Sequence, residues 1–190
     1  MALNRHALAE RIIAEAHRLG FELAGIVPAE PPTTVGFYRT WLQHGYHGEM
    51  AYLARPDAVA KRADLGAVLP GVRSVVVVGA NHHSQPLPAG LGDDPSRGVM
   101  ASYAWGDDYH DLLLPRLRVL AAFVASQTGR PVDHRAYVDT GPLLERDHAL
   151  AAGLGFLGKN CHLIQPRAGS WLFLGLLILD LPLNHTPASS

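Results

Sequence analysis

The sequence predicts an α/β (α+β) protein with a mixed, largely antiparallel central sheet flanked by helices. A run of four valines within Ser74–Val78 is typical of a central strand that is buried on both faces. The segment Tyr109–Thr128 places Leu113 and Leu117 at helical spacing, as expected for a helix that covers such a sheet. Segments of strand character are separated partly by helices and partly by hairpin-like turns, which indicates a mixed arrangement of strands.

The size and composition of the chain limit the class of protein to which it can belong. With 190 residues, of which 48% are hydrophobic and 17% charged, the chain suits one domain with a real core, which we place over residues 1–183. Residues 184–190 are polar and are expected to form a disordered tail. The formal net charge of −1 provides no global attraction for nucleic acid, so any RNA contact would come from a local patch.

Three features of the sequence predict a cytoplasmic protein that does not enter a membrane. The single cysteine, Cys161, excludes a disulfide framework. The amino terminus lacks the charged and then apolar plan of a signal peptide. The most apolar run, Trp171–Leu179, is about half as long as a helix that crosses a bilayer. We also expect the protein to be a monomer.

The first half of the chain is expected to alternate helices, one short strand and proline-rich turns. Asn4–Leu19 has a helical pattern, with Asn4 as a suitable N-cap. Phe21–Val27 is short, apolar and contains glycine, so it predicts a strand. After a proline-rich stretch, the pattern predicts a helix over Thr34–His44, then a turn and a short helix over Tyr46–Leu53.

The second half is expected to begin with a buried strand and a long loop. Residues 81–98 are rich in Gly, Pro, Asp and Ser and predict that loop. Helices are predicted over Tyr109–Thr128 and Leu144–Ala152. The strands predicted after the loop are Val99–Trp105, Val132–Val138, Cys161–Ile164 and Ser170–Leu179. A turn containing Pro166 and Gly169 would join the last two strands as a hairpin.

Asp139 follows a predicted strand and stands beside a Gly-Pro turn. Asp139-Thr140-Gly141 is the tripeptide of aspartic peptidases, but these enzymes need two such carboxylates to share a proton, and the chain has one. Two interpretations stay open from the residues alone. Asp139 suits a general acid whose pKa is raised by partial burial, or a turn aspartate that caps the helix beginning at Leu144.

The glycines after that helix resemble two nucleotide-binding patterns. Gly153-x-Gly155-x-x-Gly158 matches a dinucleotide fingerprint, and Gly153-x₄-Gly158-Lys159 nearly matches a phosphate loop. Both patterns need a strand before the glycines and a helix after them, and here the order is reversed. Asn160 also stands where a Mg²⁺-binding Ser or Thr is required. A helix end with a tight connection is the simpler explanation, with Lys159 as a cation that could face a ligand.

Two further groups of side chains have the composition of possible binding sites. The eleven histidines form no spacing with cysteines or carboxylates that completes a tetrahedral set, so no metal ligand is predicted. Tyr103–His110 combines aromatic and acidic residues with a glycine. Core packing is its default role, but its polar, loop-like character makes it a candidate wall for a large planar ligand. Arg62 and Lys159 could add cationic groups to that site.

Several segments follow one another in the order of the motifs of one family. They are Gly45-Tyr46-His47-Gly48-Glu49-Met50-Ala51-Tyr52-Leu53, Arg62-Ala63-Asp64, Leu69-Pro70-Gly71-Val72-Arg73-Ser74-Val75, Tyr103-Ala104-Trp105-Gly106-Asp107-Asp108-Tyr109-His110, Val138-Asp139-Thr140-Gly141-Pro142-Leu143-Leu144-Glu145-Arg146, Gly153-Leu154-Gly155-Phe156-Leu157-Gly158-Lys159-Asn160 and Gly169-Ser170-Trp171-Leu172-Phe173-Leu174-Gly175. From about Phe21 to Leu183, the chain resembles the N-terminal, cobalamin-binding domain of epoxyqueuosine reductase. Because several independent motifs occur in order, the resemblance is specific.

The resemblance implies a cobalamin-dependent oxidoreductase of tRNA modification. That family removes the epoxide oxygen of epoxyqueuosine at the wobble position, in a two-electron reduction that completes queuosine synthesis. It implies that Asp139 is the proton donor and that Glu145 and Arg146 bind the substrate, a tRNA carrying epoxyqueuosine in its anticodon loop. The residues assigned to cobalamin are Arg62, Ser102, Tyr103, Asp107, Tyr109, His110, Lys159, Asn160 and Ser170.

The chain departs from the family pattern in its supply of electrons. The family continues into a part with two [4Fe–4S] clusters, each held by four cysteine thiolates, and a helical-repeat region that helps to hold tRNA. One cysteine cannot build such a cluster, so a truncated or split catalytic domain, reduced by a separate iron–sulfur partner, is expected. Cys161 and Leu176 also replace residues that are common in the family. The alternative is a non-catalytic module that binds cobalamin or another tetrapyrrole.

Overall fold

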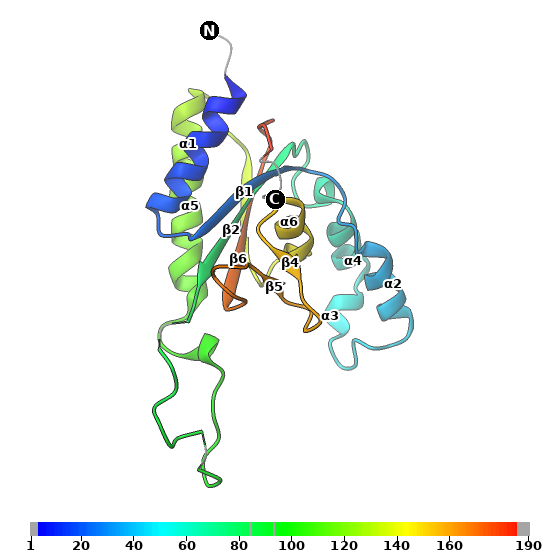
Figure 1. Ribbon diagram of the computed structural model, residues 1–190. Helices are drawn as coiled ribbons and strands as arrows, with labels where there is room; N and C mark the ends of the chain where they lie inside the picture. The colour runs from blue at the N-terminus through cyan, green and yellow to red at the C-terminus, as the bar shows by residue number, and fades with distance from the viewer. Residues whose placement is uncertain (1–3, 84, 93, 186–190) are drawn as a thin grey trace.

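The computed structural model describes residues 4–83, 85–92 and 94–185. Its centre is a four-stranded sheet in the order β1-β2-β6-β3, in which every neighbouring pair is antiparallel. The strands are β1 (Leu23–Pro28), β2 (Ser74–Asn81), β3 (His134–Val138) and β6 (Leu172–Leu179). The predicted class, a largely antiparallel sheet flanked by helices, is therefore confirmed (Figure 1).

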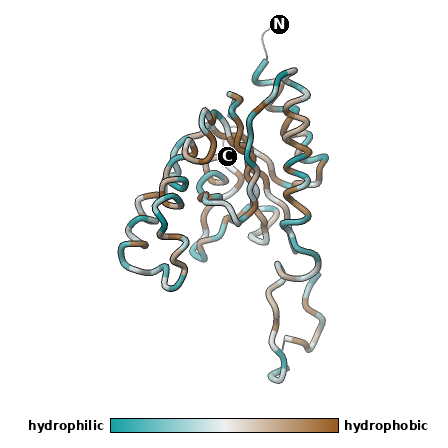
Figure 2. The backbone as a smooth tube through the Cα atoms, turned by 180° about the vertical axis from the view of Figure 1, so that it is seen from behind, coloured by the Kyte–Doolittle hydropathy of each residue, from teal (hydrophilic) through white to brown (hydrophobic). Residues whose placement is uncertain are grey.

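The run of valines in β2 supplies both faces of the sheet. Val76 and Val78 belong to the cluster that packs under α1 (Arg5–Arg18) and α5 (Tyr109–Thr128). Val75 and Val77 belong to the opposite cluster, which α6 (Glu145–Ala151) covers. Because alternate side chains of a strand point to opposite faces, a central strand with both faces covered needs apolar residues at every position. Figure 2 shows the most hydrophobic stretches of chain along these central strands.

The helices on the first face begin and end where the sequence predicts. Asn4 caps α1, since its side chain accepts a hydrogen bond from the Ala7 N–H at 3.2 Å. Asp108 caps α5 through the His110 N–H at 2.8 Å, and Gly129 ends that helix in the left-handed region with φ 65°. These caps fix the first turn of α5, and with it the position of Tyr109.

A small helical lobe stands apart from the sheet, on the right in Figure 1. It contains α2 (Val35–Gln43), α3 (Ala51–Ala54) and α4 (Pro56–Ala63), in which Ala58 is buried and no residue of α2 or α3 is. Thr34 begins α2 but does not cap it with its side chain; its hydroxyl and that of Thr33 donate instead to the buried carboxylate of Asp147. The lobe is therefore tied to α6 by polar contacts, which leaves its aromatic side chains available for other contacts.

Two predictions about strands are wrong. The segment Val99–Trp105 forms a short 3₁₀ helix, Ser102–Ala104, and the Trp105 indole N–H closes it by donating to the Met100 carbonyl at 3.0 Å. The predicted turn at Pro166 and Gly169 does form, closed by an antiparallel bridge between Gln165 and Gly169, but the two last predicted strands do not continue it as a hairpin. Instead β5 (Leu163–Ile164) pairs with β4 (Phe156–Leu157), while β6 lies between β2 and β3. Burial of the apolar half of β6 at the sheet centre outweighs pairing with its neighbour in sequence.

The glycines that resemble nucleotide patterns are explained by this small β4–β5 hairpin. A Cβ on Gly155 would lie 2.4 Å from the Ile164 carbonyl oxygen, and one on Gly158 would lie 2.5 Å from the Ile164 side chain. The glycines therefore allow two stretches of backbone to approach closely. They follow α6 and precede no helix, so the simpler explanation from the sequence holds.

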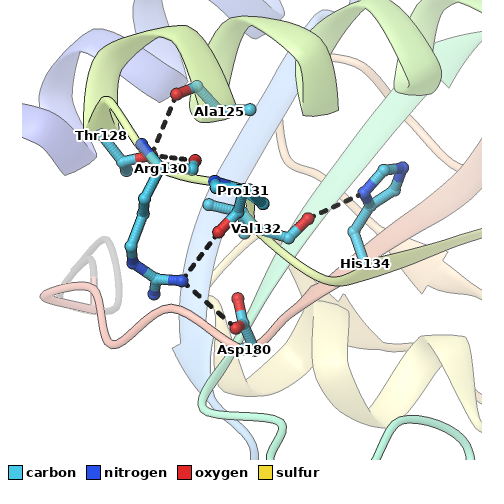
Figure 3. A network of polar contacts seen from close by, with 7 residues as sticks. All are labelled: Ala125, Thr128, Arg130, Pro131, Val132, His134 and Asp180. Atoms are coloured by element: carbon cyan, nitrogen blue, oxygen red, sulfur yellow. Dashed lines mark hydrogen bonds and ion pairs between the residues drawn. The ribbon is translucent and has the colours of Figure 1, made fainter.

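At its first residue, β3 is held by a network of polar contacts (Figure 3). The Arg130 guanidinium donates to the Pro131 carbonyl at 2.8 Å and reaches Asp180, just after β6, at 3.4 Å. The Asp180 N–H donates to the Asp133 carbonyl at 3.0 Å. These contacts close the sheet edge at the end opposite to Asp139.

The remaining predictions concern absences and the chain end. Among the described residues, no helix is long and apolar enough to cross a membrane. The same part of the chain brings together no group of three His, Cys, Asp or Glu side chains that could hold a metal ion. The expected disordered tail falls at 186–190 for the most part, which lies outside the described residues.

Candidate active site

Asp139 occupies an unusual backbone conformation directly after β3. Its φ is 57°, in the left-handed region that residues other than glycine seldom adopt, and Cys161 is the one further such residue in the part of the chain described. The Thr140 N–H donates to the Val138 carbonyl at 2.6 Å, which makes Asp139 the central residue of a γ-turn with positive φ. Such turns are strained and persist where the surroundings impose them, as they do around active sites.

The Asp139 carboxylate accepts a hydrogen bond from the first residue of α5. The Tyr109 hydroxyl donates to Asp139 Oδ2 at 2.8 Å. Burial, and next the Asp139 carboxylate, raise the pKa of Tyr109, so this phenol keeps its proton and acts as the donor. The interpretation of Asp139 as a helix cap is wrong, because Leu144 is the N-cap residue of α6 and no side chain makes a capping hydrogen bond there.

Stacked rings hold Tyr109 in place. Its ring lies against that of Phe173 in β6, with centroids 4.1 Å apart and planes 9° apart. The His110 ring also stacks on the Tyr109 ring, and their centroids are 4.1 Å apart. His82 contacts the same Phe173 ring at 4.6 Å, and burial lowers the pKa of this histidine. A ring fixed by its neighbours cannot swing away, so the Tyr109–Asp139 hydrogen bond has a defined direction.

Tyr109 also lines a cavity of about 310 Å³ at the end of the sheet. Its walls are formed by Ala80, Asn81, His82, His83, Ser102, Tyr103, Trp105, Asp107, Tyr109, Leu112, Leu113, Arg116 and Phe173. Four of the nine residues assigned to a cofactor from the sequence are in this set: Ser102, Tyr103, Asp107 and Tyr109. We call it the aromatic cavity. At its rim Tyr103 is 55% exposed, which leaves a ring face open to a ligand.

A second, larger cavity of about 640 Å³ lies between the helical lobe and α6. We call it the lobe cavity. Its walls are formed by Thr34, Phe37, Tyr38, Trp41, Leu143, Leu144, Glu145, Arg146, Asp147, Leu150, Leu157 and Cys161. Both residues assigned to the substrate, Glu145 and Arg146, therefore face one cavity. Sequence reasoning missed the aromatic wall from α2, because its side chains have the periodicity of an ordinary helix.

Glu145 links the lobe cavity to Asp139 electrostatically. Burial raises the pKa of Glu145 to about 7, and the charge of Asp139 adds to this rise while Arg62 and Arg146 oppose it. Arg62 lies over the Tyr38 ring, 5.4 Å from its centroid. Arg146 donates to the Cys161 carbonyl. A carboxyl with such a pKa can change protonation state near neutral pH, which ordinary surface carboxyls do not.

The other residues assigned to a cofactor lie on separate segments around these cavities. Lys159 and Asn160 are in the loop between β4 and β5, where Asn160 Oδ1 accepts from the His162 N–H at 3.2 Å. Ser170 precedes β6, beside a Trp171 ring that stacks on His83 at 4.2 Å. Arg62 is in the helical lobe, and His110 bonds Asp108 at 2.8 Å. The structure thus gathers one subset at the aromatic cavity and places the rest on the helical lobe, the start of α5, the β4–β5 loop and the segment before β6.

The chemistry of this surface fits a large planar cofactor with amide arms. Tyr103 and Trp171, about half exposed, offer flat apolar faces there. The Nδ1 of His82 and the Nε2 of His110 are buried without hydrogen-bond partners, so polar atoms also remain for a ligand to satisfy.

Comparisons with known proteins point to one family. Residues 62–140 match the family model described as epoxyqueuosine reductase QueG, DUF1730. The epoxyqueuosine reductase of Gloeobacter violaceus is 43% identical over 93% of this chain and 54% of its own length. That of Synechocystis is 40% identical over 77% of this chain and 48% of its own length. The chain thus spans about half the length of the curated relatives it matches.

Solved structures share the fold. A crystal structure of epoxyqueuosine reductase with an epoxyqueuosine-modified tRNA-Tyr stem loop has a TM-score of 0.80 and 27% identity, covering 97% of this chain and 48% of the other. The Bacillus subtilis reductase, described with its catalytic aspartate loop swung out of the active site, has a TM-score of 0.73 and 26% identity over the same shares. A reductive dehalogenase with 18% identity and a TM-score of 0.58, matched over all of this chain and 22% of its own, shares the fold alone.

Proposed function

The chain belongs to the epoxyqueuosine reductase family, of whose curated members it spans about half, and from this premise we propose that it contains the site at which cobalamin-dependent reduction of epoxyqueuosine in tRNA takes place. In this reaction two C–O bonds of the epoxide break and a C=C bond forms. Two electrons and two protons are consumed, and the oxygen leaves as water. The chain must therefore supply a proton near the leaving oxygen and a place for the electron-transferring group.

The observation that most supports this proposal is Asp139 in its strained turn. The Tyr109 hydroxyl donates a hydrogen bond to Oδ2 of Asp139, whereas Oδ1 of Asp139 makes no hydrogen bond within the described residues. Oδ1 is therefore the atom that would deliver a proton to the epoxide oxygen. Tyr109 keeps the carboxyl oriented while that proton is transferred. The description of a catalytic aspartate loop in the Bacillus subtilis reductase agrees with a role for an aspartate in a loop.

Cobalamin is the cofactor we propose for the open side beside the aromatic cavity. When bound, it would supply two electrons through its reduced cobalt. Tyr103, Ser102 and Asp107 would contact it from the segment before α5. Lys159, Asn160 and Ser170 would contact it from the β4–β5 loop and the start of β6, with Arg62 and His110 on either side. These contacts would keep the cofactor against the sheet end and exclude water from the reacting epoxide.

The tRNA and the electron source complete the proposal. We propose that Glu145 and Arg146, which line the lobe cavity, contact the modified nucleoside of a tRNA. A similar protein, solved with an epoxyqueuosine-modified tRNA stem loop, supports tRNA as the substrate. A [4Fe–4S] cluster needs four thiolates, and these 190 residues contain one cysteine, so the electrons would reach the cofactor from iron–sulfur clusters outside this sequence.

Cobalamin titration followed by visible spectroscopy tests the cofactor. We expect a saturable spectral change at micromolar protein, and a smaller affinity for Tyr103→Ala, which removes an exposed ring face. Absence of any change would refute the cofactor assignment. Activity is then measured with epoxyqueuosine-containing tRNA and a chemical reductant. Binding of cobalamin without turnover under any reductant would favour the non-catalytic module instead.

A further inference from the structure

Gly141 lies against the side chain of Tyr137, which precedes it in the last part of β3. A Cβ added to Gly141 would lie 2.6 Å from Cδ1, 2.7 Å from Cγ and 2.9 Å from Cβ of Tyr137. The Cβ of Tyr137 is fixed by its backbone, so rotation of the ring alone could not relieve this crowding. Gly141 is buried, whereas Asp139 and Thr140 between the two residues are exposed. The chain therefore folds back on itself directly after β3, with Asp139 at the tip.

Both sides of the Tyr137–Gly141 contact are held by the core. Tyr137 pairs with Leu176 of β6 and packs, half-buried, against the cluster that α6 covers. Pro142 restricts the backbone of Gly141, because a residue before proline is disfavoured in the helical region. Leu143, which follows, is buried in the same cluster. Neither side of the contact can therefore move away without disturbing buried residues.

This contact explains how Asp139 keeps a backbone conformation that it would not adopt by itself. Its φ of 57° is unfavourable for a residue with a side chain, so the surroundings must impose it. The Tyr109 hydroxyl, at the start of α5, holds the carboxylate of Asp139. Gly141 and Tyr137 hold the backbone that follows, on the face of the sheet that α6 covers. Two contacts, from opposite faces of the sheet, thus position one carboxyl.

We propose that Gly141 and Tyr137 are positioning residues: their contact fixes the turn after β3 and so holds the Asp139 carboxyl where it can deliver a proton. A side chain at position 141 would push the segment off the Tyr137 ring and let Asp139 leave the left-handed region. Gly141 does not itself have a positive φ, so close packing, and not backbone freedom, requires a glycine there. This inference rests on the proposed function, in which Asp139 is the acid.

NMR of Gly141→Ala tests the positioning without cofactor or substrate. In the native chain the Tyr109 hydroxyl donates to Asp139, and the ¹³Cζ signal of a labelled tyrosine responds to such a bond. Tyr109→Phe assigns the signal, and Asp139→Ala shows its position when the acceptor is missing. We expect the Tyr109 signal of Gly141→Ala to shift to that second position. A signal that stays at the native position would overturn the inference.

A double-mutant cycle separates positioning from a general loss of stability. Gly141→Ala should slow single-turnover epoxide reduction by about 100-fold, because a misplacement of about 1 Å can cost that factor, and cobalamin affinity should stay near its native value. Adding Asp139→Asn to Gly141→Ala should slow the reaction no further, since the displaced carboxyl no longer takes part. If the two losses multiply instead, Gly141 has a merely structural role and the inference is wrong.

Two other glycines serve as controls. Gly25→Ala, in β1, places a Cβ 2.9 Å from that of Ala152, with β2 and β6 between it and β3. It should lower the free energy of unfolding but keep the full dependence of the rate on Asp139. Gly36→Ala, at an exposed position where a Cβ would meet no atom within 4 Å, should behave as the native chain does. A Tyr109 signal that shifts in either control would contradict the assignment to Gly141.

Variants of Tyr137 keep the inference testable if Gly141→Ala does not fold. Tyr137→Ala removes the ring from the other side of the contact and should shift the Tyr109 signal in the same direction, whereas Tyr137→Phe keeps the ring and should not. A native Tyr109 signal in Tyr137→Ala would contradict the inference. The proposed function fails separately: if the native chain reduces no epoxide while Gly141→Ala still shifts the Tyr109 signal, that function is wrong and the positioning of Asp139 stands.

Discussion

The two ends of β3 differ in how their backbone is held. Just before the first residue of β3, a connected set of hydrogen bonds joins the strand to the end of β6. It is formed by Arg130, Asp133 and Asp180. At the last residue, Asp139 has a positive φ and one side-chain partner, Tyr109. The same strand thus begins at a set of connected contacts, in which Asp180 still keeps a buried Oδ1 without a partner, and ends in a strained turn that carries an exposed carboxyl.

This difference indicates where the molecule accommodates strain for function. Backbone strain reduces stability, and it persists where the rest of the fold holds it in place. The sheet provides that support, because β3 is anchored by its pairing with β6 from His134 to Val138. Substitutions at the two ends should therefore affect different quantities: activity at the Asp139 end and stability at the Asp180 end.

The largest effect is expected for Asp139→Asn. Asn tolerates positive φ and keeps a hydrogen bond with Tyr109, but it cannot donate an acidic proton. We expect epoxide reduction to fall by about 100-fold or more, with the free energy of unfolding changed by less than about 0.5 kcal/mol. Single-turnover assays with reduced cobalamin and urea unfolding measure the two quantities. Full activity would remove Asp139 from the role of acid.

Glu145→Gln should change the pH dependence of stability. The folded pKa, about 7, lies above the ordinary value of 4.5, so the folded state holds a proton that the unfolded state has released. This group thus favours folding at low pH and loses that contribution as pH rises from about 4.5 to 7. Around it, the charge of Asp139 raises the pKa and those of Arg62 and Arg146 lower it.

The expected size of this change is on the order of 2 kcal/mol between the two ends of that pH range. Urea unfolding of the native chain and of Glu145→Gln across the range measures it. The variant should lack this part of the pH dependence, and Glu22→Gln should keep it. Parallel curves for the native chain and Glu145→Gln would show that Glu145 has an ordinary pKa in the folded protein.

Tyr109→Phe is expected to have a smaller effect on activity. The variant keeps the ring that stacks on Phe173 but loses the hydrogen bond to Asp139. We expect epoxide reduction to slow by about tenfold, because the carboxyl is then less firmly oriented. Cobalamin binding should change less than activity does. A loss as large as that of Asp139→Asn would instead give Tyr109 a direct part in proton transfer.

The smallest effect is expected at the closed end of β3. Asp180→Asn removes the charge that faces Arg130 but leaves the amide N–H of residue 180 bonded to Asp133. Since the pair is partly exposed and 3.4 Å long, the free energy of unfolding should change by less than about 1 kcal/mol, with activity unchanged. A loss of activity here would show that the two ends of β3 are coupled.

Particular residues show how far local pattern could predict the structure. The helix Tyr109–Thr128 and the buried strand from Ser74 were predicted well, because their apolar spacing and caps act within the segment. The prediction of a strand over Val99–Trp105 was wrong. Whether a segment pairs with another strand depends on the rest of the fold and not on its own composition alone. The predicted hairpin failed since the choice of partner for β6 depends on the whole sheet.

The sequence by itself determined the class of the fold, the positions of the long elements and Asp139 as the candidate acid, since each depends on residues close together in the chain. Tertiary structure decided which distant groups meet: Tyr109 with Asp139, and the ring of Tyr38 with Arg62. It also decided that Glu145 has a buried oxygen without a partner. Burial, and the charges that surround a group, arise only when separate segments pack, so no local pattern reports them.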